Sequence, residues 1–159
     1  MSAGMLIELN SKILKKGPFA SGTVKSTIES RPDFESTQVI FRRISDSAIQ
    51  IIGIMNGRHW EFIFKDNLTL GKYNIGAPEI NNFIYVQTVP HDPDYDHVFI
   101  ADPGSGGITV IKVDFVKGEL EFDFKCTVTR EGFPGTTTKT EGKVAVSGMQ
   151  QTRQHPVHK

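Results

Sequence analysis

The stretch from Gly107 to Val128 constrains the fold more than any other part of this sequence. It contains two runs, GITVIKVDF and ELEFDFKCTV, joined by a short turn that includes Gly118. In the second run apolar residues alternate strictly with polar ones, so that Leu120, Phe122 and Phe124 fall on one side. A β-strand sends successive side chains to opposite faces, whereas a helix would spread these residues around its circumference. The pattern predicts a β-hairpin with one buried and one solvated face.

Comparable short runs, separated by turn residues, cover most of the chain. Asn56-Gly57 is a strong hairpin signal, because both residue types accept the positive φ that a two-residue turn requires. The segments Pro90–Asp96 and Asp102–Gly107 are predicted to be a polar loop and a long turn. No segment has a convincing helical period. We expect strands at 22–29, 37–44, 48–55, 58–64, 71–75, 81–89, 97–101, 107–115, 119–128 and 136–147, and a short one at 6–10.

This organisation predicts an all-β fold. About nine to eleven short strands joined by tight turns are typical of an antiparallel sandwich, with a closed, calycin-like barrel as the alternative. The segment 48–55, AIQIIGIM, is apolar almost throughout, which favours a central strand buried on both faces. The alternative is that one of its faces lines a ligand cavity or forms a subunit interface.

Composition limits the number of domains and the kinds of partner. The chain has 159 residues, and we expect residues 1–148 to form a single β domain. Residues 149–159 carry two basic residues, no acidic residue and no apolar period, so we expect a disordered basic tail. Lys+Arg and Asp+Glu both number 18, and this balance argues against a nucleic-acid partner.

The chain shows neither a secretory signal nor a membrane span. Met5-Leu6-Ile7 is apolar, but Glu8 follows at once, and no run approaches the ~20 apolar residues that cross a bilayer. We therefore expect a cytoplasmic protein, with export by another route left open. The one cysteine, Cys126, excludes an intramolecular disulfide and lies on the apolar side of its strand, which favours an inert core thiol over a nucleophile.

The second half of the chain resembles an uncharacterised family of small bacterial β-sandwich domains, often found as lipoproteins. The residues that carry the resemblance are Gly71-Lys72-Tyr73, Phe83-Ile84-Tyr85, Ser105-Gly106-Gly107-Ile108-Thr109-Val110, Leu120 to Phe124, and Thr140-Glu141-Gly142-Lys143-Val144. They cover roughly residues 68–147. The chain departs from the family in lacking the lipoprotein signal and its lipidated cysteine. The resemblance implies a sandwich fold and assigns no catalytic residue.

The densest polar cluster precedes the central hairpin. Asp92, Asp94 and Asp96, with His91, have a spacing that can place oxygen ligands around Ca²⁺. The helical calcium-loop motif also requires Gly at its sixth position and Glu at its twelfth, and the chain lacks both. The alternative is a solvated loop whose Asp and Pro residues supply turn chemistry, with no cofactor bound.

Other polar residues near this cluster are candidates for an interaction surface. Four residues of the loops between 90 and 107 are assigned to it: Tyr95, His97, Asp102 and Ser105.

An acidic row, Glu119, Glu121 and Asp123, has a carboxylate spacing seen in glycosidases. Lys125 continues that row, as expected of an ordinary solvated strand face.

Three functions follow from these features. The first is a non-enzymatic binding protein that acts through a sheet face or the loops at 90–107, with another protein or a second copy of itself as partner. The second is a carrier of a small apolar ligand inside a β-barrel. The third is a hydrolase, which has little support because the chain contains neither a nucleophile elbow nor a zinc-hydrolase motif.

Overall fold

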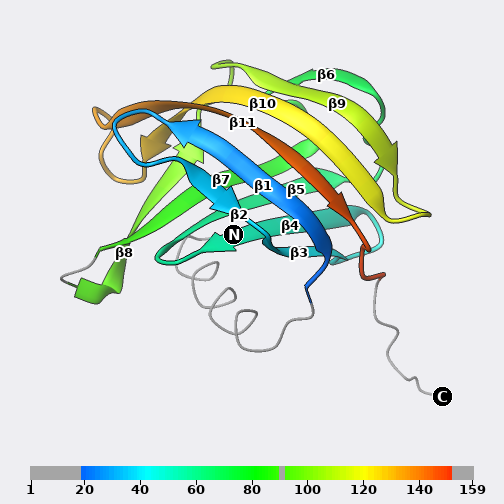
Figure 1. Ribbon diagram of the computed structural model, residues 1–159. Coiled ribbons are helices and arrows are strands. Elements are labelled where there is room, and N and C mark those ends of the chain that lie inside the picture. The colour runs from blue at the N-terminus through cyan, green and yellow to red at the C-terminus, as the bar shows by residue number, and fades with distance from the viewer. Residues whose placement is uncertain (1–18, 90–91, 152–159) are drawn as a thin grey trace.

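The computed structural model describes residues 19–89 and 92–151, with side chains at every described position except 89 and 92–95. Strands account for 67% of the described residues, and none of these residues is helical, which confirms the predicted all-β class. The strands are β1 (Ser21–Ile28), β2 (Phe34–Ser36), β3 (Gln38–Arg43), β4 (Ala48–Met55), β5 (Arg58–Lys65), β6 (Gly71–Asn74), β7 (Ile80–Val89), β8 (Asp92–Ala101), β9 (Gly107–Asp114), β10 (Glu119–Arg130) and β11 (Thr137–Ser147). Figure 1 shows their arrangement.

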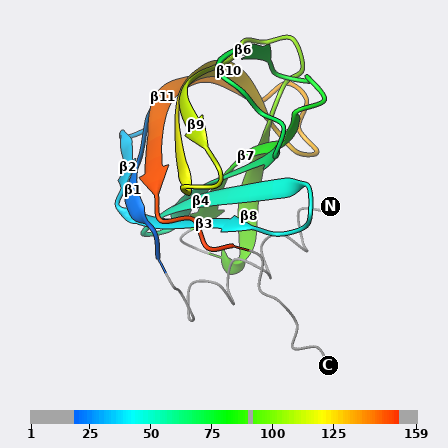
Figure 2. The same ribbon diagram turned by 90° about the vertical axis from the view of Figure 1, so that its right-hand side faces the viewer.

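The strands form one antiparallel sheet that nearly closes into a barrel. Its order is β2-β1-β11-β10-β8-β7-β5-β4-β3, with β9 paired to β10 and β6 paired to β9. The two ends of this order, β2 and β3, are separated in the chain only by Thr37. Because β2 pairs with β1 while β3 pairs with β4, the bent stretch 34–43 joins the two edges of the sheet. Seen from one end of the barrel, the strands form a nearly complete ring (Figure 2).

Of the two predicted arrangements, the closed barrel is therefore the one that the structure fits. The strand alternation that predicted a β fold is the same in a sandwich and in a barrel, since both have one inner and one outer face. The difference lies in how the edges pair. Ala20 donates its backbone N–H to the carbonyl of Val39 at 2.7 Å, which adds a further link across the closure.

The barrel closes tightly where β1 passes over β4. A Cβ atom added to Gly53 would lie 2.7 Å from the Cβ of Val24, so the absence of a side chain at Gly53 makes room for the valine. The Ser36 hydroxyl donates a hydrogen bond to the backbone carbonyl of Ile54 at the same corner. Small residues and a buried hydroxyl thus allow the sharp bend.

Aromatic rings fill the interior. Trp60, Phe62 and Phe64 follow one another along the inner face of β5, and all three are completely buried. The Phe62 ring meets the Phe122 ring of β10 edge-on at 5.3 Å between centroids, and Trp60 meets Phe124 at 5.2 Å. Such edge-to-face contacts add to the energy of apolar burial.

Both hairpins that the sequence predicts with most force are present. Met55 pairs with Arg58 across the two-residue turn, where Gly57 has a φ of 73°. The strand 48–55 is buried on both faces over its central part, as its continuous apolar character predicts. In β10 the apolar residues from Leu120 to Val128 are all buried, and the polar residues between them face outward.

Three segments differ from the sequence-based expectation or continue beyond it. β2 falls in a stretch without clear periodicity and has no predicted counterpart. The predicted polar loop 90–96 is largely part of β8, because its backbone continues the ladder with β7 whatever its side chains are.

Beyond residue 148, Met149 is buried in the core and Gln150 donates its N–H to the carbonyl of Phe41 at 2.9 Å. The predicted strand 6–10 and residues 152–159 of the predicted tail lie outside the described residues.

Removing the Phe122 ring should destabilise the barrel severely. Phe122 is fully buried and contacts the rings of Phe62 and Phe64. We expect Phe122→Ala to lower the free energy of unfolding by about 3–5 kcal/mol. Urea denaturation followed by Trp60 fluorescence measures the change. Glu121→Gln is the control, because Glu121 faces outward and pairs only loosely with Lys143 at 4.0 Å. Equal effects of the two substitutions would contradict this packing.

Candidate functional site

Of the four predicted calcium ligands, only Asp96 has a described side chain. His91 and the side chains of Asp92, Asp94 and Tyr95 lie outside the described residues. Asp96 is on β8, half-buried, and pairs with Thr88 of β7. Among the described side chains, no group of three or more His, Cys, Asp or Glu residues is placed to hold a metal ion. The calcium hypothesis therefore has no support from the described residues and stays a prediction.

His97 lies on β8, opposite Gln87 of β7, and is half-buried. Burial lowers the pKa of its imidazole, and the nearby charges of Arg130 and Arg31 lower it further, while the Asp96 carboxylate raises it. The surroundings of His97 thus disfavour its charged form on balance.

Asp102 and Ser105 have a structural use. β8 and β9 pair with different parts of the same side of β10, which leaves a gap beside Thr127. The Ser105 hydroxyl fills it, accepting the N–H of Thr127 at 3.0 Å and lying 2.7 Å from the carbonyl oxygen of Asp102, to which it donates. The Asp102 carboxylate accepts the hydroxyl of Thr129 at 2.7 Å. Both side chains complete the sheet where no strand continues it.

The acidic row on β10 is paired with lysines. Lys112 of β9 lies 3.6 Å from Glu119, and Lys143 of β11 lies 3.4 Å from Asp123. These ion pairs cross neighbouring strands on a solvated face, an arrangement that contributes little to stability and much to solubility. The geometry is that of an ordinary outer strand face.

Cys126 is buried in the core. Burial, together with the charge of the nearby Asp102 carboxylate, raises the pKa of its thiol to about 12. The thiol stays protonated at neutral pH, whereas nucleophilic cysteines are thiolates. The structure therefore agrees with the prediction of an inert core thiol.

One end of the barrel is covered by the β1–β2 turn. Arg58 donates from Nε to the hydroxyl of Tyr85 at 2.6 Å and from Nη2 to the carbonyl of Pro32 at 2.8 Å. Arg31 places its guanidinium 4.9 Å from the centre of the Phe99 ring, a cation–π contact. These contacts hold the β1–β2 turn across this end of the barrel, and both arginines have structural partners there.

The opposite end carries an open pocket of about 530 Å³, between the β5–β6 loop and the β9–β10 turn. Figure 2 looks onto this end. Leu68 is buried at the pocket, whereas two apolar side chains of its lining are exposed to solvent, Leu70 by 64% and Val116 by 93%. A volume of this size lies within the range of binding pockets, and barrel mouths are a common place for them.

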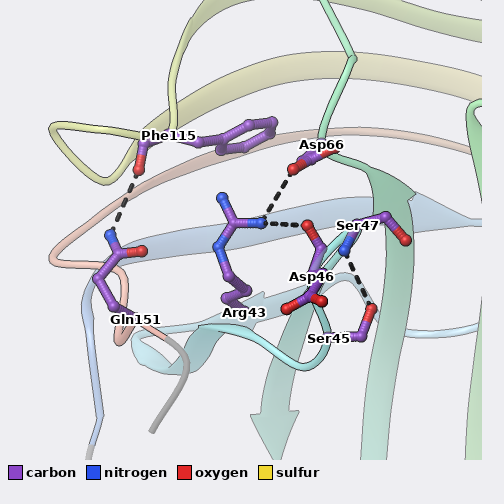
Figure 3. Close-up of polar contacts among 7 residues, drawn as sticks. All are labelled: Arg43, Ser45, Asp46, Ser47, Asp66, Phe115 and Gln151. Carbon is purple, nitrogen blue, oxygen red and sulfur yellow. Dashed lines mark hydrogen bonds and ion pairs between the residues drawn. The ribbon is translucent and has the colours of Figure 1, made fainter. Parts of the chain in front are cut away.

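An ion pair lies in the same pocket (Figure 3). Arg43, at the end of β3, contacts the Asp66 carboxylate at 3.0 Å and donates from Nη1 to the carbonyl of Asp46 at 3.2 Å. Across the pocket, Gln151 donates to the carbonyl of Phe115 at 3.3 Å. The result is a partly apolar concavity with one fixed pair of opposite charges, which we call the mouth pocket.

A separate polar network lies on the outer face of β3, β4, β5 and β7. Glu61 is completely buried, and its carboxylate accepts hydrogen bonds from Gln50 at 2.6 Å and from Asn82 at 3.4 Å. Arg42 donates to the other end of the Gln50 amide at 2.8 Å. Burial raises the pKa of Glu61, and the hydrogen bonds and the charge of Arg42 oppose this rise. A raised carboxyl pKa often marks a functional site, but the Glu61 carboxyl group is buried.

His59 lies two residues from Glu61 on the same outer face and is half-buried. Burial lowers the pKa of its imidazole to about 4, so the ring is neutral at physiological pH.

Searches for related proteins give no match to any family model, any curated protein or any solved structure. The resemblance to the bacterial β-sandwich family thus stays a prediction. Within the described residues, no helix is long and apolar enough to cross a membrane.

The sequence analysis overlooked the mouth pocket. Its local signal is the presence of apolar residues in turns, Leu70 after β5 and Val116 between β9 and β10, where polar residues are usual. That the two turns share one pocket depends on the pairing of β6 with β9, which links segments nearly forty positions apart.

Replacing Ser105 should weaken the sheet. Ser105→Ala leaves the partly buried N–H of Thr127 without its hydroxyl partner, at an expected cost of about 1–2 kcal/mol in the free energy of unfolding. Ser45→Ala is the matched control, since the Ser45 hydroxyl serves an exposed turn where water can replace it. Denaturant titration compares the two variants, and a neutral Ser105→Ala would show that the loop does not complete the sheet.

Glu61 should make stability depend on pH. Its pKa is raised in the folded state, so the unfolded chain ionises first as pH rises above about 4.3, the ordinary value for glutamate. Stability that is present below that pH should decline as pH rises through the folded pKa, by about 1.4 kcal/mol for each unit between the two pKa values. The difference in unfolding free energy between wild type and Glu61→Gln, measured from pH 4 to 8, should shift in favour of the variant. A difference that does not change with pH would contradict the raised pKa.

Proposed function

We propose that this chain is a non-enzymatic binding protein that docks a segment of another protein at the mouth pocket. The observation that supports the proposal most is the exposure of Leu70 and Val116 on the rim of one pocket. Isolated exposed apolar residues are common, but apolar residues gathered around a concavity mark interaction sites. This is the class of function that the sequence predicts. The proposed binding surface is the mouth pocket, however, and not the loops at 90–107.

The chemistry of the mouth pocket suits a peptide segment. Burial of Leu70 and Val116 against a partner contributes roughly 1.5–3 kcal/mol each in transfer energy. Arg43 and Asp66 have side chains that are 20% and 35% exposed, so both retain access to backbone or side-chain groups of a partner. Interfaces commonly combine an apolar centre with arginine and a polar rim.

A small apolar ligand fits this barrel less well. Carriers bury most of the ligand surface inside a cavity. Here the interior is occupied by large, fully buried side chains, among them Trp60, Tyr85, Phe62 and Phe122. The mouth pocket, in turn, leaves its rim side chains in solvent, which is a feature of a surface that another chain covers.

Site-specific photo-crosslinking in cells tests the proposal. A photoreactive phenylalanine analogue at Val116 should form a crosslink of defined mass with a protein partner or with a second copy of the chain. The matched control places the analogue at Thr136, an exposed residue at the opposite end of the barrel. Leu70→Asp should reduce the Val116 crosslink at least tenfold, equivalent to about 1.4 kcal/mol of binding energy.

Two outcomes would contradict this function. One is equal crosslinking from Val116 and Thr136, which would mean random collision. The other is saturable one-to-one binding of an apolar fluorescent probe that Leu70→Asp abolishes, because such binding would favour a small-ligand carrier. Light scattering on the purified chain over a concentration series separates self-association from binding of a different protein.

A further inference from the structure

One outer face of the barrel is buried although none of the described strands lies across it. It consists of outward-facing residues of β3, β4, β5, β7 and β8, and we call it the isoleucine face. The exposed fractions of its side chains are 3% for Ile40, 0% for Ile52, 6% for Ile63, 8% for Ile84 and 1% for Val86. Outward-facing side chains of an uncovered barrel wall would be in contact with solvent. These values therefore indicate a covering segment.

The described elements do not supply that cover. The apolar clusters on the isoleucine face contain only residues of its own strands: Ile84, Val86 and Val98 in one, and Ile40, Ile52 and Ile54 in the other. The fully buried carboxylate of Glu61 lies on the same face. A covering segment therefore belongs to the part of the chain outside 19–89 and 92–151, or to another molecule.

The chain enters the described fold beside this face. Ala20 is hydrogen-bonded to Val39 of β3, which is the first strand of the isoleucine face. Residues 1–18 precede this point. Five adjacent strands at about 4.8 Å spacing give the face a width of roughly 20 Å. Eighteen residues span about 27 Å even at the helical rise of 1.5 Å each, so the segment is long enough to cross it.

The sequence of residues 1–18 suits an apolar surface. Residues 5–14 contain six large apolar residues, Met5, Leu6, Ile7, Leu9, Ile13 and Leu14, with lysines at 12, 15 and 16. The other parts of the chain outside the described residues are poorer candidates. Residues 90–91 are too short, and Val157 is the only large aliphatic residue of 152–159.

We propose that residues 1–18 of the same chain dock on the isoleucine face through Leu6, Leu9 and Ile13. The N-terminal segment is then an integral part of the folded unit, and the face is an intramolecular docking surface. Its release would expose a row of aliphatic side chains on five strands, together with Glu61.

Paramagnetic relaxation on the full-length chain tests the contact. Cys126 is buried, so a nitroxide attaches selectively to a cysteine introduced by Ser11→Cys. The methyl signals of Ile52, Ile63 and Ile84 should lose most of their intensity. The methyl signal of Ile111 is the internal control, since it is exposed on β9, which is not part of this face. Unchanged signals from the isoleucine face would overturn the proposal.

A second sample distinguishes contact within one chain from contact between two chains. It mixes isotope-labelled chains without nitroxide and unlabelled chains with nitroxide. Loss of the Ile52 signal in this mixture would mean that the segment comes from a second copy, which overturns the intramolecular contact. No loss in the mixture, together with loss in the singly labelled chain, supports it.

Substitution gives an independent test. Leu9→Asp should raise the fluorescence of an apolar dye several-fold and relieve the loss of the Ile52 signal in the nitroxide experiment. Asn10→Asp, which adds the same charge at the neighbouring polar position and leaves residue 11 free for the nitroxide, should change neither. Equal responses of the two variants, or no response from either, would overturn the proposal.

Discussion

Aromatic rings of β5 pack against aromatic rings of β10 and hold the two walls of the barrel together. Trp60, Phe62 and Phe64 present one column, and Phe122 and Phe124 present the other, with centroids about 5 Å apart. The two strands lie in opposite walls of the barrel, so their contact fixes its width. The indole N–H of Trp60 also donates to the Ser26 hydroxyl at 3.0 Å, which links the column to β1. A filled interior leaves the outer surface and the barrel ends for binding.

The two ends of the barrel differ in how their openings are covered. At one end, Arg58 and Arg31 hold the β1–β2 turn across the opening through hydrogen bonds and cation–π contacts. At the other end, no comparable plug covers the mouth pocket among the described residues, and Leu70 and Val116 are left in solvent. The proposed binding role follows from this asymmetry. The isoleucine face is a third surface, distinct from both ends, where burial of Glu61 and Ile52 indicates cover rather than access.

Much of the fold could be predicted because its signals are local. Strict alternation from Leu120 to Val128 and the Asn56-Gly57 turn each determine the backbone within a few residues. Closure could not be predicted, because it depends on the bend at Thr37 and on strand pairs that are distant in sequence. The buried Ser36 also interrupts the apolar pattern of β2, because its hydroxyl donates to the carbonyl of Ile54 on a strand distant in sequence. For the same reason Asp102 and Ser105 resembled interaction residues, although they complete a gap in the sheet.

The central claim is that aromatic rings occupy the barrel interior, so that binding takes place outside it. Xenon enters empty apolar cavities in proteins and is readily located by diffraction. A crystal of the full-length chain under xenon pressure tests the claim most directly. We expect no ordered xenon among Trp60, Phe62, Phe122 and Phe124. A well-occupied xenon site between β5 and β10 would contradict this packing and would favour the small-ligand carrier.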